Sequence, residues 1–146
     1  MTKLSAIAVT LIVFTVIATD SGRYEVTNAS VERQSLESYV GKYPSELFKS
    51  EPGLKRRVKT LLGPNYRFFM ARLQVEMPIE NIEGTLLARG CMAHSCGIEE
   101  AILAIGLNDG KLHAAILSKK FGGKFRLFSE DKGHVPAALR RAIEQQ

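Results

Sequence analysis

The residues most able to do chemistry lie in one short segment, Cys91-Met92-Ala93-His94-Ser95-Cys96. It places the two cysteines of the chain around an apolar pair, a histidine and a small hydroxyl, namely Cys91, Met92, Ala93, His94, Ser95 and Cys96. Within it, the His94 side chain alone can donate, accept or carry charge. With a reference pKa of about 6.5, an imidazole pairs with carboxylates as a cation or hydrogen-bonds them when neutral. Sites that contain two clustered acids are therefore natural targets for His94.

Several kinds of site could use these residues. In an oxidising compartment the two thiols persist as a disulfide, which stabilises a ring of this size by only about 2 kcal/mol but pre-orders it for insertion into a cleft. A simpler interpretation is a stapled hairpin in which His94 is incidental. A zinc site would need a fourth ligand, from His113 or His134, and thiol exchange favours Cys-x-x-Cys spacing. We expect a Cys91–Cys96 disulfide and neither a metal nor a cofactor.

The beginning of the chain has the pattern of an export signal. Lys3 precedes an apolar run from Leu4 to Ile17, and Ala18 ends a possible cleavage site. The run of about 14 residues is shorter than the roughly 20 that span a bilayer. We predict a signal peptide at 1–18, a polar, flexible lead-in at 19–38 and one domain at 39–146, in a periplasmic or secreted protein with no stable membrane span after cleavage.

The chain is basic, with 20 Lys and Arg against 15 Asp and Glu, a net charge of +5. Loss of residues 1–18 removes only the charge of Lys3 and leaves +4. Basic residues gather at 55–59 and near the end, where the cations are Lys119, Lys120, Lys124, Arg126, Lys132, Arg140 and Arg141. Such clusters suit an anionic polymer or membrane surface, or are solvated faces without a partner. We expect no nucleic-acid partner.

Hydrophobic periodicity predicts helices in the first half of the domain and strands in the second. The helical pattern covers 39–73, with breaks at 51–53 and 63–64. Strand-like runs follow at 79–82, 85–91, 99–107, 112–118 and 124–128, separated by turn residues, and a last helix begins at Pro136. We predict an α+β fold with an antiparallel meander of about five strands, helices packed on one face and a C-terminal helix.

Around the cysteines the sequence resembles the Ivy family, inhibitors of vertebrate lysozyme, whose loop reads Cys-Lys-Pro-His-Asp-Cys and is often followed by glycine. The matching residues here are Cys91, His94, Cys96 and Gly97, and the segment 39–44 (Tyr-Val-Gly-Lys-Tyr-Pro) looks like an opening segment of such domains. The resemblance implies a periplasmic, non-enzymatic inhibitor that can dimerise. It also implies that the loop plugs the active-site cleft and that its histidine hydrogen-bonds the catalytic acid and the second carboxylate.

Three loop residues depart from the family motif, because Met92 replaces lysine, Ala93 replaces proline and Ser95 replaces aspartate. These changes remove charged contacts and a conformational restraint. A basic inhibitor is also repelled by the usual basic animal lysozymes, so a bacterial lytic transglycosylase or a peptidoglycan-cleaving toxin is an alternative target. The competing function is a non-inhibitory basic envelope protein that binds peptidoglycan or acidic glycan. An enzyme ranks third, since the sequence shows no adjacent nucleophile and base and no phosphate-binding glycine loop.

Overall fold

The computed structural model describes residues 34–132 and 134–145. The predicted signal peptide at 1–18 and most of the predicted lead-in lie outside these residues. A helical turn at 34–37 buries Leu36 in the main core, so the packed part of the chain includes residues before position 39. Within the described ranges, no helix combines the length and the hydropathy needed to cross a membrane.

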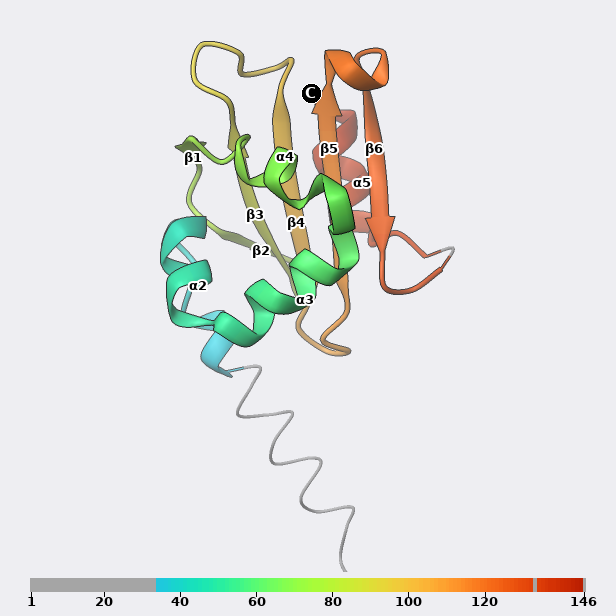
Figure 1. Cartoon of the computed structure of the whole chain (residues 1–146). Helices are drawn as coiled ribbons and strands as arrows, with labels where there is room; N and C mark the ends of the chain where they lie inside the picture. Colours follow the sequence, from blue (N-terminus) through green and yellow to red (C-terminus); the bar gives the residue numbers. More distant parts are fainter. Residues whose placement is uncertain (1–33, 133, 146) are drawn as a thin grey trace, which may run out of the picture.

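Three short helices form a layer in front of the sheet in Figure 1: α2 (Pro44–Ser50), α3 (Pro52–Leu62) and α4 (Tyr66–Met70). Proline occupies the first position of α2 and α3, where a missing N–H costs nothing. In α3, Leu54, Val58 and Leu62 recur every four residues and are buried, so one stripe of the helix faces the sheet. The 3₁₀ turn η1 (Gly63–Asn65) separates α3 from α4.

The sheet is antiparallel throughout, in the order β1-β3-β4-β5-β6, with β2 also paired to β3. Its long strands are β3 (Thr85–Cys91), β4 (Glu100–Gly106), β5 (Leu112–Ser118) and β6 (Lys124–Ser129). Two short strands, β1 (Val75–Glu76) and β2 (Glu80–Ile82), pair with opposite ends of β3. The 3₁₀ turn η2 (Lys119–Phe121) joins β5 to β6.

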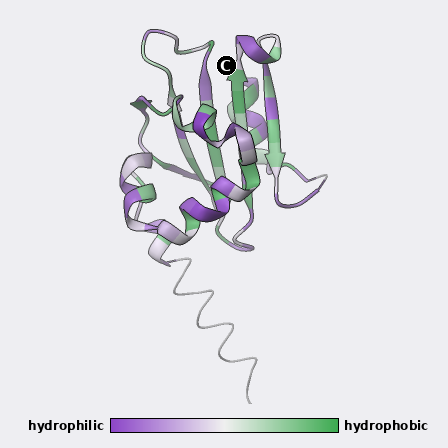
Figure 2. Ribbon diagram, viewed as in Figure 1, coloured by the Kyte–Doolittle hydropathy of each residue, from purple (hydrophilic) through white to green (hydrophobic). Residues whose placement is uncertain are grey.

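The sheet is covered on both faces. Alternate residues of the central strands, such as Leu103 and Ile116, join α2, α3 and α4 in the main core. The intervening residues, such as Leu87 and Ile102, pack against α5 (Ala137–Glu144), which lies behind the sheet in Figure 1. Figure 2 shows the hydrophobic residues concentrated along these strands, which agrees with strands buried on both sides.

The predicted α+β class is confirmed, and the predicted bounds of the strands at 85–91 and 112–118 agree with β3 and β5. Two details differ from the sequence pattern. Helix α4 ends at Met70 rather than near Leu73, and the two-residue strand β1 was not predicted. Both differences arise where the chain leaves the helical layer to join the sheet.

His113 is a buried titratable group on β5, with 2% of its surface exposed. Its Nδ1 lies 2.9 Å from the Ser129 hydroxyl, and its ring makes an edge contact with His134. Burial, the largest effect, lowers the pKa of His113, and His134 lowers it further. The acids Asp109, Asp131 and Glu130 only partly oppose this. The folded protein therefore favours the neutral imidazole.

We predict that His113 makes the protein less stable as the pH falls from 7.5 to 5.5. In the unfolded chain His113 binds a proton at the ordinary histidine pKa of about 6.5, whereas in the folded chain burial opposes protonation. The contribution of neutral His113 to the free energy of unfolding is therefore complete above that pH and is lost as the pH falls below it. Urea unfolding across this range should show a weaker pH dependence in His113→Gln than in the parent. His134→Gln removes only the smaller of the two effects that lower the pKa of His113, so it should weaken the pH dependence less than His113→Gln does. Equal slopes for parent and His113→Gln would contradict the prediction.

Candidate functional site

The loop between β3 and β4 forms one end of the molecule, at the top of Figure 1. Cys91 is the buried last residue of β3, and Cys96 is exposed. The two form a disulfide with their Cα atoms 5.0 Å apart. Because both sulfurs are committed to this bond, the cysteines are not available as zinc ligands. In the described part of the chain, no three His, Cys, Asp or Glu side chains gather where a metal could bind.

Backbone hydrogen bonds order the loop within the disulfide ring and beyond it. The Met92 N–H donates to the Glu99 carbonyl (2.9 Å) and closes the base of the loop. The Ser95 N–H donates to the Met92 carbonyl (3.0 Å), and the Glu99 N–H donates to the Ser95 carbonyl (2.9 Å). The connection between β3 and β4 therefore consists of two successive hydrogen-bonded turns, and His94 lies within the first.

His94 has a backbone conformation that is uncommon for a residue with a side chain. Its φ is +62°, in the left-handed region, which costs an L-residue roughly 1–2 kcal/mol outside a constrained setting. His94 is exposed, whereas its neighbours Met92, Ala93 and Ser95 are half-buried. The loop thus presents one protruding polar side chain.

Gln74 supports the loop from outside the ring. Its Oε1 accepts a hydrogen bond of 3.2 Å from the Ala93 N–H, a donor that a proline at position 93 would lack. A further contact fixes the residue after the ring, where the Gly97 N–H donates to the Glu100 carboxylate at 2.6 Å. These two contacts restrain the loop although position 93 carries no proline, and a proline there could not make the first of them.

The base of the loop is anchored by an ion pair between Arg72 and Glu99. The side chain of Arg72 is 3% exposed and that of Glu99 is 14% exposed. Arg72 also donates to the Phe68 carbonyl (2.7 Å) and to the Ser118 hydroxyl (3.2 Å). Its guanidinium lies 3.2 Å from the centre of the Phe68 ring, so charge and stacking both hold it in place.

Glu99 connects the loop to the end of β5. Its Oε1 accepts hydrogen bonds from the Ser118 hydroxyl (3.2 Å) and the Lys119 N–H (3.0 Å). Burial alone would raise the pKa of Glu99. The hydrogen bonds from Lys119, Ser118 and Arg72, together with the charge of Arg72, outweigh burial and hold the pKa below its usual range. Glu99 is therefore ionised at neutral pH, as its pairing requires.

The supporting residues Arg72, Gln74, Glu99 and Glu100 were not identified from the sequence. A signal was present, because Glu99 and Glu100 are two adjacent acids at the start of an otherwise apolar strand. Because buried acids are paired in folded proteins, a cation or hydrogen-bond donors beside Glu99 and Glu100 could have been expected. Nothing in the local pattern around Arg72 distinguished it from a solvated helix residue.

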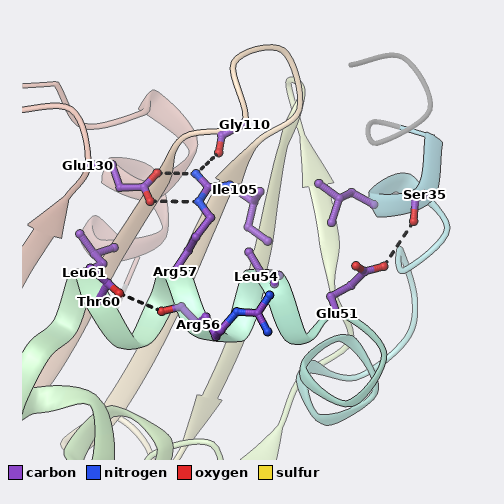
Figure 3. Close-up of a pocket in the computed structure, with 12 residues that line it drawn as sticks. Ser35, Glu51, Leu54, Arg56, Arg57, Thr60, Leu61, Ile105, Gly110 and Glu130 are labelled. Carbon is purple, nitrogen blue, oxygen red and sulfur yellow. Dashed lines mark hydrogen bonds and ion pairs between the residues drawn. The ribbon is translucent and has the colours of Figure 1, made fainter. Parts of the chain in front are cut away.

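A groove of about 810 Å³ lies away from the loop, between α3 and the turn that joins β4 to β5 (Figure 3). Its hydroxyl groups are occupied, because Ser35 contacts Glu51 (3.3 Å) and Thr60 donates to the carbonyl of Arg56 (3.1 Å). Arg57 closes one end through bonds to Glu130 and to the Gly110 carbonyl. The contacts of Arg57 attach α3 to the end of β6 and to the turn between β4 and β5.

The other sequence candidates are separated from the loop or from each other. His113 is buried near the start of β5, and its neighbour His134 is exposed just before α5. Exposed Lys55 and Lys59 lie on α3, and Arg140 and Arg141 lie on α5. By contrast, η2 brings Lys119 and Lys120 to the same end of the sheet as His94 (Figure 1).

Comparison with protein-family models matches residues 53–146 to the family described as inhibitor of vertebrate lysozyme (Ivy). The matched range runs from the second residue of α3 to the end of the chain and contains the whole disulfide loop. The opening segment 39–44 lies before it. Neither the curated proteins nor the solved structures gave a match to the chain.

We predict that the Arg72–Glu99 pair has a much larger effect on stability than an exposed pair. Arg72→Met leaves a largely buried carboxylate without its partner and should reduce the free energy of unfolding by about 3 kcal/mol. The control Arg57→Met breaks an exposed pair with Glu130 and should cost about 1 kcal/mol or less. Urea denaturation measures both variants. The double variant Arg72→Met/Glu99→Met should recover part of the loss, and equal costs for the two single variants would refute this assignment.

Proposed function

Since this chain belongs to the Ivy family, whose members are inhibitors rather than enzymes, we propose that it inhibits a lysozyme or a related muramidase by inserting the Cys91–Cys96 loop into the active-site cleft. His94 is the key contact, and Met92, Ala93 and Ser95 form the wall of the inserted loop. The observation that carries the proposal is the exposed His94 held with a positive φ at the tip of a disulfide-closed loop.

The chemistry of the target explains why a histidine suits this position. Retaining glycosidases keep two carboxyl groups roughly 5 to 5.5 Å apart, one protonated and one ionised. The two nitrogens of a single imidazole can address both groups, one as a hydrogen-bond donor and the other as an acceptor or a second donor. A loop already ordered before binding loses little further entropy, which favours tight association.

The proposed setting is the periplasm or the cell exterior. Residues 1–18 have the pattern of an export signal, and an oxidising compartment preserves the Cys91–Cys96 disulfide. Lytic transglycosylases belong with lysozymes among the proposed targets because both cleave peptidoglycan through acidic residues in a cleft. A homodimer is compatible with this mode provided that the loop end stays free.

We predict that His94→Ala abolishes inhibition without affecting the fold. The variant removes the one side chain proposed to contact both carboxylates, and loss of such a central contact should raise the inhibition constant on the order of 100-fold. Muramidase assays on peptidoglycan, with the free energy of unfolding measured in parallel, provide the test. The control His134→Ala removes another exposed histidine and should inhibit like the parent. Full inhibition by His94→Ala would exclude the proposed contact.

We also predict that the disulfide affects inhibition more than its modest effect on stability suggests. In Cys91→Ala/Cys96→Ala the free energy of unfolding should fall by about 2 kcal/mol. The protein stays folded, but the loop must now be ordered during binding, so inhibition should weaken by about tenfold or more. Inhibition constants determined well below the unfolding midpoint separate the two effects. An unchanged inhibition constant would show that the hydrogen bonds alone order the loop.

A further inference from the structure

Four exposed cations form a patch at the loop end of the sheet. Lys119 and Lys120 belong to η2, and Lys124 and Arg126 belong to β6; we call these four the basic patch. Among the residues that the structure describes, none of the four side chains forms an ion pair. Their charge is therefore available to a partner.

Aromatic rings position two of these cations. The Lys120 Nζ lies 5.1 Å from the centre of the Phe68 ring, and the Arg126 guanidinium lies 5.3 Å from that of Phe121 and 5.8 Å from that of Phe128. Phe68 and Phe121 contact each other edge to face, with their centres 5.5 Å apart. Cation–π contact orients a cation without neutralising it, so the patch keeps its charge.

The basic patch has a fixed position relative to the inhibitory loop. One residue, Glu99, accepts the Lys119 N–H through its carboxylate and the Met92 N–H through its backbone carbonyl. This acid is already paired with Arg72, so it does not offset the charge of the patch. The loop and η2 lie at the same end of the sheet in Figure 1 and are joined through Glu99.

Three arginines elsewhere on the molecule are compensated. Arg57 pairs with Glu130 at 2.6 Å, Arg89 with Glu80 at 2.6 Å, and Arg141 with Glu83 at 2.7 Å. Other exposed cations that form no ion pair among the described residues, such as Lys55, Arg56 and Lys59, lie on α3, away from the loop. The basic patch differs from them in its place at the loop end, where its charge favours a partner that is acidic beside the docked loop.

We propose that the basic patch binds an acidic surface beside the active-site cleft of the target enzyme, so that the preferred partner is an acidic muramidase rather than a basic lysozyme. This inference rests on the proposed inhibitory function. It concerns an acidic protein surface rather than an anionic glycan, because the rigid connection to the loop sets one geometry for both contacts, which a flexible polymer does not require.

The test compares two double charge reversals that change the net charge equally. Lys119→Glu/Lys120→Glu inverts half of the basic patch, and the matched control Lys55→Glu/Lys59→Glu inverts two exposed lysines on α3. The purified, oxidised proteins are assayed against an acidic lytic transglycosylase and a basic animal lysozyme at low and high salt. Thermal unfolding verifies that each variant is folded, and the milder Lys119→Gln/Lys120→Gln replaces the reversal if it is not.

The parent should inhibit the acidic enzyme at least about tenfold more strongly than the basic one at low salt, and the difference should shrink at high salt. Reversal in the patch should slow association with the acidic enzyme on the order of tenfold and improve inhibition of the basic enzyme. Reversal on α3 should change either value by about twofold or less, because its charges lie away from the docking end.

Four outcomes would overturn the proposal. If the two reversals have equal effects, the preference depends on net charge alone. If the patch reversal has no effect while His94→Ala still abolishes inhibition, the patch does not bind the target but the inhibitory function stands. If the patch reversal weakens a salt-sensitive binding to purified peptidoglycan but leaves inhibition of both enzymes unchanged, the patch binds glycan rather than the target enzyme. If the parent inhibits neither enzyme, the inhibitory function fails together with this inference.

Discussion

The ion pair between Arg72 and Glu99 is the interaction on which the geometry of the loop end depends. It connects three parts of the fold, because Arg72 follows α4, Glu99 precedes β4 and both contact Ser118 at the end of β5. A largely buried ion pair adds little net stability compared with apolar residues of the same size, but it is costly to break and specific in geometry. Its effect here is to define where the loop begins relative to the sheet.

The two-sided burial of the sheet explains why functional features are confined to its ends. Strands β3, β4 and β5 are apolar on both faces, one covered by α2, α3 and α4 and the other by α5. No face of these central strands is left to bind a partner. The loops and turns at the ends of these strands carry polar groups into solvent, and the loop between β3 and β4 is the one closed by a disulfide.

The sequence was informative wherever one local pattern determined the structure. The apolar runs that became β3 and β5, the proline that begins α3 and the cysteine pair all depend on neighbouring residues. It was uninformative where contacts join distant segments. Strand β1 has two residues and no measurable period, and the burial of Arg72 follows from Glu99 and Ser118, which are 27 and 46 positions away. The left-handed conformation of His94 was likewise not indicated by any pattern in the sequence.

The departures from the family motif acquire a physical meaning beside the basic patch. With Met92 and Ser95 in place of lysine and aspartate, His94 is the one ionisable side chain between the two cysteines. The charge able to select a partner lies instead on η2 and β6, outside the inserted segment. In the proposed mode, different residues therefore block the active site and select the target enzyme. The loop has one ionisable side chain and enters the cleft without the desolvation cost of further ions. The exposed cations contact the rim of the cleft, where charges chiefly govern association and specificity. Glu99 keeps the two surfaces in register, since it is bonded to both.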